Sequence, residues 1–268
     1  MKLIFLDVDG TIYSKANMIP ESVKQAVTKA RENGHKVFLN TGRSFVQIPK
    51  SLWAIGFDGM IGSAGSYIRI GDKVLYHEPL EGELVEKVCD YFLEKKMFFL
   101  LEANECIYGT KECVEFQRAR FEGASEEILD CFVRSLIVCD LIEKVRDVNK
   151  IMFFKSPIPY EMISKEFSKE LSVIQGTQSF NKGICGEIYS KQRNKALAME
   201  KVAKYYQVGM ADTIAFGDGH NDYEMLEAAG IGVAMGNGAS SLKERADFVT
   251  KEAKEDGIYY GFKHLGLL

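Results

Sequence analysis

The most restrictive feature of this sequence is a short apolar strand that runs directly into a pair of aspartates. The residues from Lys2 to Leu6 are almost all apolar, and "DVDGT" comes directly after them, with Asp7 and Asp9 two positions apart. A continuous apolar run bounded by turn residues is typical of a strand buried on both faces, as the strands of a parallel sheet are. The fold must therefore bury this strand and still leave two carboxylates at its end.

The next segment, "IPESVKQAVTKARENGHKVFLN", predicts a helix and then a second strand. Apolar residues recur at helical spacing between Pro20 and Gly34, and residues 36–40 have the composition of a strand. A strand, helix and strand in this order form a right-handed crossover with two parallel strands. Asp7 and Thr41 are therefore expected at the same edge of one sheet, at the carboxyl ends of its strands.

The same alternation of strands and helices returns near the end of the chain and is interrupted in the middle. Residues 83–186 contain several apparent strands with covering helices, which is typical of a separate α+β module. We expect an α/β fold, with a doubly wound, Rossmann-like parallel sheet as the core domain (1–82 and 187–268) and an inserted α+β cap domain (83–186). Further elements are predicted as strands at 59–62, 213–216 and 231–235, a hairpin turn at Gly71-Asp72, and helices at 194–206 and 224–229.

Composition excludes several classes of partner. Lysine and arginine total 34 against 38 aspartates and glutamates, a formal charge of -4, so a broad basic surface for nucleic acid is not expected. The sequence has no apolar stretch of the roughly 20 residues that a membrane span needs, and Asp7 comes too early for a signal peptide. We expect a cytoplasmic protein whose six cysteines, which form no C-x-x-C pair, are reduced thiols. The sequence indicates no oligomeric state.

Polar clusters stand at four places where strands end or helices begin. They are Asp7 with Asp9, Thr41-Gly42-Arg43, Lys195, and "GDGHND" from Gly217 to Asp222. Gathered in one pocket, the four aspartates Asp7, Asp9, Asp218 and Asp222 could not all stay ionised unless a cation joined them, and Mg²⁺ prefers such oxygen ligands. Lysine, threonine and backbone amides bind phosphoryl oxygens. The combination predicts a magnesium-dependent phosphoryl transfer.

The two residues of the first aspartate pair suit different tasks. Asp7 at the strand tip can attack phosphorus and form an aspartyl phosphate. Asp9, beyond the strand end, can protonate the leaving alcohol and later take a proton from water. Gly10 lets the backbone turn without a side chain in the pocket.

Taken together, these motifs resemble those of a known family, the haloacid dehalogenase (HAD) superfamily of phosphatases, and within it the Cof-type, class IIB branch. "FLDVDGTIYS", "FLNTGRS", "EIYSKQRNKALAMEKV" and "AFGDGHNDYEML" are similar to its four motifs, in the same order and spacing. The tail "GVAMGNGASSLKERADFVTKEAKEDGI" is similar to the segment that comes after the fourth motif in this branch. One departure is Ala64-Gly65-Ser66, where the family commonly has Asn-Gly-Ala.

The resemblance implies a role for each matched residue. Asp7 would be the nucleophile, Asp9 the general acid/base, Thr41 a ligand of the transferring phosphoryl group, and Lys195, rather than Lys191, the cation that orients Asp7. Mg²⁺ would be held by the side chain of Asp7, the backbone carbonyl of Asp9, and Asp218, with Asp222 acting directly or through water. Secondary contacts to the phosphate or to the loop that carries Asp7 would come from Gly10, Gly42, Arg43 and Asn221. The inserted domain would close over the site and set specificity for a small phosphorylated metabolite, such as a sugar phosphate.

Three other functions use similar residues. A phosphomutase would return the phosphoryl group to another substrate hydroxyl, and a phosphoaspartate signalling receiver also surrounds magnesium with acids, a hydroxyl and a lysine. A receiver is disfavoured by the inserted domain and by Asp9, which would shorten the life of a phosphoaspartate. The third alternative is a non-catalytic ligand-binding protein on the same fold.

Overall fold

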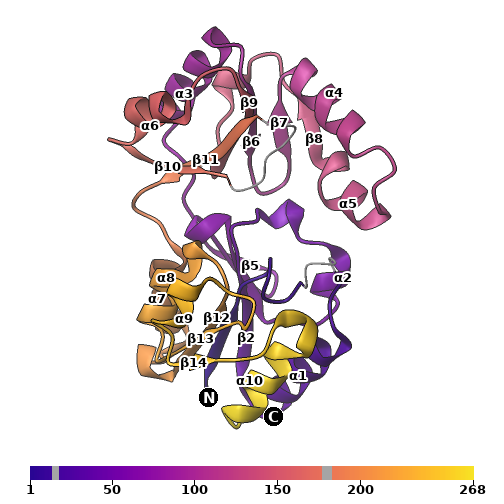
Figure 1. Ribbon diagram of the computed structural model, residues 1–268, viewed down its shortest axis with the longest axis vertical. Coiled ribbons are helices and arrows are strands. Elements are labelled where there is room, and N and C mark those ends of the chain that lie inside the picture. The colour runs from indigo at the N-terminus through magenta and orange to yellow at the C-terminus, as the bar shows by residue number, and fades with distance from the viewer. Residues whose placement is uncertain (14–17, 177–182) are drawn as a thin grey trace. The chain divides into compact units, whose positions relative to one another are not determined.

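The computed structural model describes residues 1–13, 18–176 and 183–268. They divide into two compact units (Figure 1). The first unit comprises Met1–Arg43, Lys50–His77 and Arg193–Leu268, and the second comprises Ser44–Pro49 and Glu78–Gln192. The expected boundaries at 82/83 and 186/187 differ from these. The strand Ile184–Ser190 pairs with a neighbour on each side in the second unit's sheet, and this pairing carries residues 187–190 into that unit.

The first unit is built on a sheet of eight described strands in the order β14-β13-β12-β1-β2-β3-β4-β5. The strands from β14 to β3 are parallel, and β4 and β5 form an antiparallel hairpin at one edge. The bounds are β1 (Leu3–Leu6), β2 (Lys36–Asn40), β3 (Gly59–Gly62), β4 (Tyr67–Ile70), β5 (Lys73–His77), β12 (Thr213–Gly217), β13 (Ile231–Ala234) and β14 (Phe248–Val249). This mixed α/β arrangement with a parallel core confirms the predicted fold class.

Helices cover both faces of this sheet, which is why its central strands are apolar throughout. On one face, Phe5 and Phe38 pack with Met199 and Met225 of α7 and α8. On the other, the ring of Phe216 lies 5.4 Å from that of Phe262 in α10, and α10 packs against α1. The bounds are α1 (Glu21–Glu32), α2 (Lys50–Trp53), α7 (Lys195–Tyr206), α8 (Tyr223–Ala228), α9 (Ser240–Lys243) and α10 (Gly257–His264).

The register of the three central strands brings their carboxyl ends to one edge. Leu6 in β1 lies opposite Leu39 in β2 and Phe216 in β12. Because the strands are parallel, the residues that come after these three positions emerge side by side. Asp7 is the first of them.

The second unit has its own core and its own sheet, whose described residues form six strands in the order β10-β11-β9-β6-β7-β8. Helices α3 and α6 contribute Phe92 and Phe167 to a cluster with Phe99 and Phe153 of the sheet. The bounds are β6 (Phe98–Glu102), β7 (Ile107–Gly109), β8 (Leu136–Val138), β9 (Lys150–Ser156), β10 (Leu171–Gln175), β11 (Ile184–Ser190), α3 (Gly82–Glu94), α4 (Lys111–Arg120), α5 (Glu126–Cys131) and α6 (Tyr160–Phe167). Ser44–Pro49 belongs with this unit through two hydrogen bonds, from the amide of Val46 to the carbonyl of Asn104 and from Gln47 to Glu102, each 3.0 Å.

The six cysteines, all of them described residues, are reduced thiols, the state expected from the sequence. Among the described residues, no helix combines the length and apolar character that crossing a membrane would require.

Candidate active site

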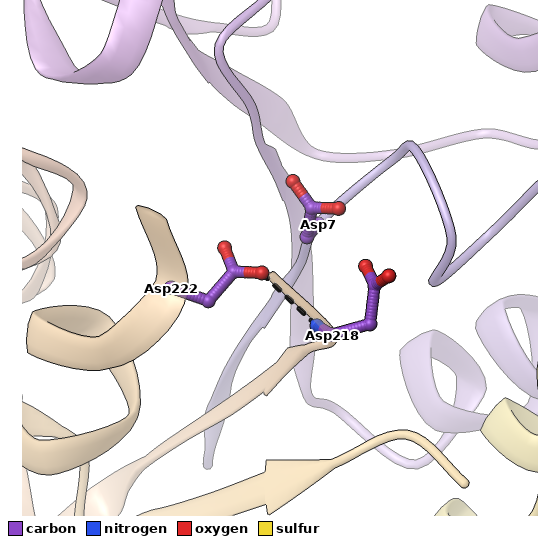
Figure 2. A group of neighbouring side chains, drawn as sticks. All are labelled: Asp7, Asp218 and Asp222. Atoms are coloured by element: carbon purple, nitrogen blue, oxygen red, sulfur yellow. Dashed lines mark hydrogen bonds between the residues drawn. The ribbon is translucent and has the colours of Figure 1, made fainter. Parts of the chain in front are cut away.

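Three aspartates meet at the carboxyl edge of the first unit's sheet. Asp7 follows β1, Asp218 follows the neighbouring strand β12, and Asp222 ends the 3-10 turn His220–Asp222 that leads into α8. One carboxylate oxygen of each lies within 4.8 Å of the others. Figure 2 shows the three carboxylates directed into a common space, with the Asp218 amide donating to Asp222 Oδ2 at 3.0 Å.

Lys195 brings a buried ammonium group to this cluster. Its Nζ donates to Asp222 Oδ1 at 2.6 Å and to Asp7 Oδ1, and its side chain is only 1% exposed. Lys195 is the first residue of α7, whose start is fixed by Asn194: the Asn194 Oδ1 accepts from the amide of Leu197 at 2.8 Å. A helix start anchored in this way aims the lysine at the ends of β1 and β12. Lys191, the competing lysine, instead donates to the carbonyl of Ser168 in the second unit.

Burial and mutual repulsion perturb the acids of this cluster. Burial raises the pKa of Asp7 well above its usual range, the charge of Asp222 raises it further, and Lys195 opposes both. Burial, again with Asp222, raises the pKa of Asp218 to about 6. For Lys195, burial acts to lower the pKa, but the charges of Asp222 and Asp7 outweigh it and the pKa is raised. The lysine therefore stays charged beside Asp7, a carboxyl that resists ionisation.

The donor set fits a hard divalent cation. Three carboxylates facing one ammonium leave an excess of negative charge, and one oxygen of each lies within 4.8 Å of the others, so a single hard cation could be shared between them. Gly10 has a φ of +92°, and a Cβ placed there would come within 2.1 Å of Asp218 Oδ2. Only glycine therefore allows Asp218 to occupy its position.

Asp222 differs from the other two aspartates because both of its oxygens already have partners. Oδ1 accepts from Lys195, and Oδ2 accepts from the amides of Asp218 and Gly219, at 3.0 Å each. Its side chain is completely buried. These bonds close the Gly217–Asp222 loop and fix the lysine.

The carboxylate of Asp9 lies outside the cluster of three. Its side chain is 59% exposed and forms a two-pronged ion pair with Arg43, with Nε donating to Oδ2 at 2.9 Å and Nη2 to Oδ1 at 2.5 Å. The Arg43 guanidinium also lies 5.2 Å from the ring centroid of Tyr13. Asp9 and Arg43 are thus adjacent in the structure, although they come from the ends of different strands.

The other predicted site residues differ in how close they come to the cluster. Thr41 follows β2 and is 1% exposed, and its Oγ1 accepts from the amide of Arg43 at 3.2 Å. Gly42 stands in open space, since a Cβ there would meet nothing within 4 Å. Asn221 is exposed, and its Oδ1 would lie 2.8 Å from a Cβ on Gly219. His220 is exposed and stacks on the ring of Tyr223.

Sequence reasoning missed three polar residues that hold the site together. The Thr11 hydroxyl donates to Asp218 Oδ1 at 3.2 Å, and Asn237 Nδ2 donates to the carbonyl of Gly10 at 2.8 Å. Asn40 is fully buried beneath Thr41 and donates to the carbonyl of Lys195 at 3.3 Å. Thr11 and Asn237 could have been found, because each follows a strand end at the same edge as Asp7.

The chain is similar to several known proteins. Residues 4–262 match the family model described as haloacid dehalogenase-like hydrolase. A Bacillus subtilis (strain 168) protein named "Putative phosphatase YkrA" is 32% identical, over 100% of this chain and 98% of the relative. A second protein of that strain, 5-amino-6-(5-phospho-D-ribitylamino)uracil phosphatase YitU, is 28% identical, over 96% of this chain and 94% of the relative.

A solved structure has the same fold. It comes from Bacteroides thetaiotaomicron and was described among phosphatases of the haloalkanoate (HAD) enzyme superfamily. It is 26% identical with a TM-score of 0.81, covering 100% of this chain and 96% of that one. The fold similarity thus extends through both units.

Proposed function

Because the chain belongs to the haloacid dehalogenase-like hydrolases and is a phosphatase of phosphomonoesters, we propose that it acts with Mg²⁺ on a small phosphorylated metabolite, through an aspartyl phosphate on Asp7. The observation that carries this proposal is the position of Asp7. It stands at a strand tip, held by a buried lysine and facing two further carboxylates. A carboxylate oriented in this way can act as a nucleophile toward phosphorus.

In the first step, an oxygen of Asp7 attacks phosphorus, and the bond between phosphorus and the alcohol oxygen breaks. Asp9 gives its proton to the departing alcohol. In the second step, Asp9 takes a proton from water, the water oxygen attacks phosphorus, and the bond to Asp7 breaks, which releases phosphate. Lys195 keeps Asp7 oriented and offsets the charge on the phosphoryl oxygens, and Thr41 is placed to bind those oxygens.

The ion pair between Asp9 and Arg43 has to open for this chemistry. An Asp9 carboxylate that accepts both hydrogen bonds of the guanidinium cannot at the same time give a proton to the leaving alcohol, as the first step requires. An incoming phosphoryl group would compete with Asp9 for the guanidinium, because arginine binds phosphate in the same forked geometry. Substrate binding would therefore free Asp9 for proton transfer.

The metal would be held by the side chains of Asp7 and Asp218 and the backbone carbonyl of Asp9. Asp222 would act through water, because both of its oxygens are already hydrogen-bonded. When bound, Mg²⁺ neutralises charge on the phosphoryl group and helps to align it with Asp7.

The substrate class is inferred from the relatives and from the inserted domain. YitU is named for a substrate that carries a phosphorylated ribityl chain, and this supports a phosphorylated polyol or sugar here. We assign specificity for the leaving group to the second unit, which comprises Ser44–Pro49 and Glu78–Gln192.

Phosphate release tests this function. Wild type, Asp7→Asn and Asp212→Asn would each be incubated with Mg²⁺ and a panel of sugar and polyol phosphates, nucleotides and a chromogenic ester. Asp212 is a matched control, because it is an exposed carboxylate whose ion pair with Lys2 stabilises little. Release by wild type and Asp212→Asn, but not by Asp7→Asn, is expected. Release that survives in Asp7→Asn would overturn the proposal, and conversion of an ester to its isomer without net release would identify a mutase.

A further inference from the structure

Asn40 is a buried polar residue that has no part in the proposed reaction. It ends β2, directly before Thr41, and is completely buried. Phe5 and Phe38 lie opposite each other in β1 and β2 and stack with ring centroids 5.4 Å apart. Because side chains alternate along a strand, Asp7 and Asn40 form the next pair on the same face. The amide of Asn40 is therefore placed beside the nucleophile.

The contacts of Asn40 connect β2 to the two helices on that face. Its Nδ2 donates to the carbonyl of Lys195 in α7 at 3.3 Å and lies 3.0 Å from Sδ of Met225 in α8. Within the part of the chain that the structure describes, Asn40 Oδ1 has no hydrogen-bond partner. A buried acceptor without a partner is destabilising, and an apolar side chain of similar volume would avoid this cost. Stability alone does not account for an amide here.

The carbonyl that Asn40 binds belongs to the residue that controls Asp7. Lys195 reaches Asp7 and Asp222 from the first turn of α7, so a small rotation of this turn moves its ammonium. On the other side of the turn, Gly65 packs so closely that a Cβ would come within 2.4 Å of the carbonyl oxygen of Asn194. The turn is thus confined by Gly65 and hydrogen-bonded to the sheet by Asn40.

We propose that Asn40 is a positioning residue, which fixes the backbone of Lys195 to β2 and thereby sets the ammonium against Asp7. The catalytic part of this inference rests on the proposed function, whereas the anchoring of α7 does not. Loss of the anchor would shift the ammonium relative to Asp7 and leave the side chain of Arg43, a proposed ligand of the phosphoryl group, in place. The effect is therefore expected on kcat, with little change in KM.

Asn40→Leu is the test, because leucine has a similar volume and cannot donate. Thr213→Val is the matched control: Thr213 is also completely buried, and its Oγ1 donates to the carbonyl of Met210 at 2.7 Å, at the opposite end of β12 from Asp218. Steady-state kinetics with the best ester of the panel should give a kcat about 10- to 100-fold lower for Asn40→Leu, with KM changed less than about twofold. Thr213→Val should keep the wild-type kcat.

Hydrogen exchange tests, independently of catalysis, whether Asn40 anchors the first turn of α7. The amide of Met199 donates to the Lys195 carbonyl in the first turn of α7. Its exchange should accelerate at least about fivefold in Asn40→Leu and stay unchanged in Thr213→Val. Asn40→Ala repeats both measurements if the leucine variant does not fold.

Each outcome decides the proposal. Wild-type kcat in a folded Asn40 variant, an equal loss of kcat in both variants, or unchanged exchange at Met199 overturns it. If the wild type released phosphate from no ester, the proposed function would fail, and the exchange measurement alone would decide whether Asn40 anchors Lys195.

Discussion

Replacing Lys195 with methionine removes the only cation that contacts both Asp7 and Asp222 among the described residues. Methionine fills a similar volume, so the change is mainly one of charge. Lys195 is 1% exposed, and its partner side chains are 6% and 0% exposed, so neither carboxylate can recover its hydration. Removing one partner of a buried pair costs about 3–5 kcal/mol of unfolding free energy. The Lys195→Met variant should therefore be about 3–5 kcal/mol less stable than the wild type near neutral pH in the absence of Mg²⁺.

The pH dependence of this loss gives a sharper test. The pKa of Asp7 is already raised in the folded state, and it rises further without Lys195, which opposes the increase. A folded-state pKa above the unfolded value means that the folded protein binds the proton more tightly, so stability is recovered as pH falls through the raised value. The loss in Lys195→Met should therefore shrink between about pH 8 and about pH 5.5. Lys195 itself stays charged over this range in wild type, because its pKa is raised.

Urea unfolding in EDTA at both pH values measures the effect. Lys2→Met is the matched control, since Lys2 pairs with Asp212 and both side chains are more than a third exposed. That substitution should leave the unfolding free energy nearly unchanged, because solvent screens an exposed ion pair. Equal losses in the two lysine variants, or a loss in Lys195→Met that does not vary with pH, would refute the electrostatic argument.

Three further predictions concern the metal and the phosphate. Gly10→Ala should weaken Mg²⁺ binding, measured by calorimetry, at least about tenfold, because the added Cβ would displace Asp218. Gly34→Ala is the control: Gly34 also has a positive φ, but a Cβ there would meet no atom within 4 Å, so this variant should bind Mg²⁺ as the wild type does. Mg²⁺ affinity should fall as the pH drops below about 6, because the pKa of Asp218 is raised to about 6 and a protonated carboxyl is a poor metal ligand. An affinity that does not change from pH 7 to pH 5 would contradict this prediction. Arg43→Ala should raise KM about tenfold by removing a phosphate ligand, and an unchanged KM would show that Arg43 does not bind the phosphate.

The sequence predicted the sheet well because its strands have a strong signal. The continuous apolar run before Asp7 and the crossover to Thr41 were sufficient to bring Asp7, Thr41 and the Gly217–Asp222 loop to one edge. The hairpin at Gly71-Asp72 was also correct. These elements were predictable because the turn-forming residues and the pattern of apolar residues both favour the strands that the structure has.

Other parts of the fold have weak local signals. Helices α4 and α5 are polar on most of their surface and were not predicted, and β8 and β14 have three and two residues. The inclusion of Ser44–Pro49 in the second unit depends on bonds to Glu102 and Asn104, more than fifty residues away. Contacts between residues so far apart in the sequence cannot be predicted from local composition.

Within the site, the sequence identifies the charged side chains but not which of them pair with one another. Four aspartates were expected near one another, yet Asp9 pairs with Arg43 outside the buried cluster. Asn40 has no sequence signal at all, because a polar residue at the last position of a strand usually faces solvent. Its burial depends on α7 and α8 lying over that end of β2.

Trapping the phosphorylated enzyme shows whether Asp7 is the residue that attacks phosphorus. Asp9→Asn would be mixed with Mg²⁺ and a chromogenic ester whose leaving group needs no proton, quenched in acid and mapped by peptide mass spectrometry. Without Asp9 to activate water, we expect about one phosphoryl group per chain, carried on Asp7, and none when Asp7→Asn is combined with Asp9→Asn. Phosphate found on another residue, or rapid release by Asp9→Asn with no phosphorylated chain at any time, would contradict the proposed mechanism.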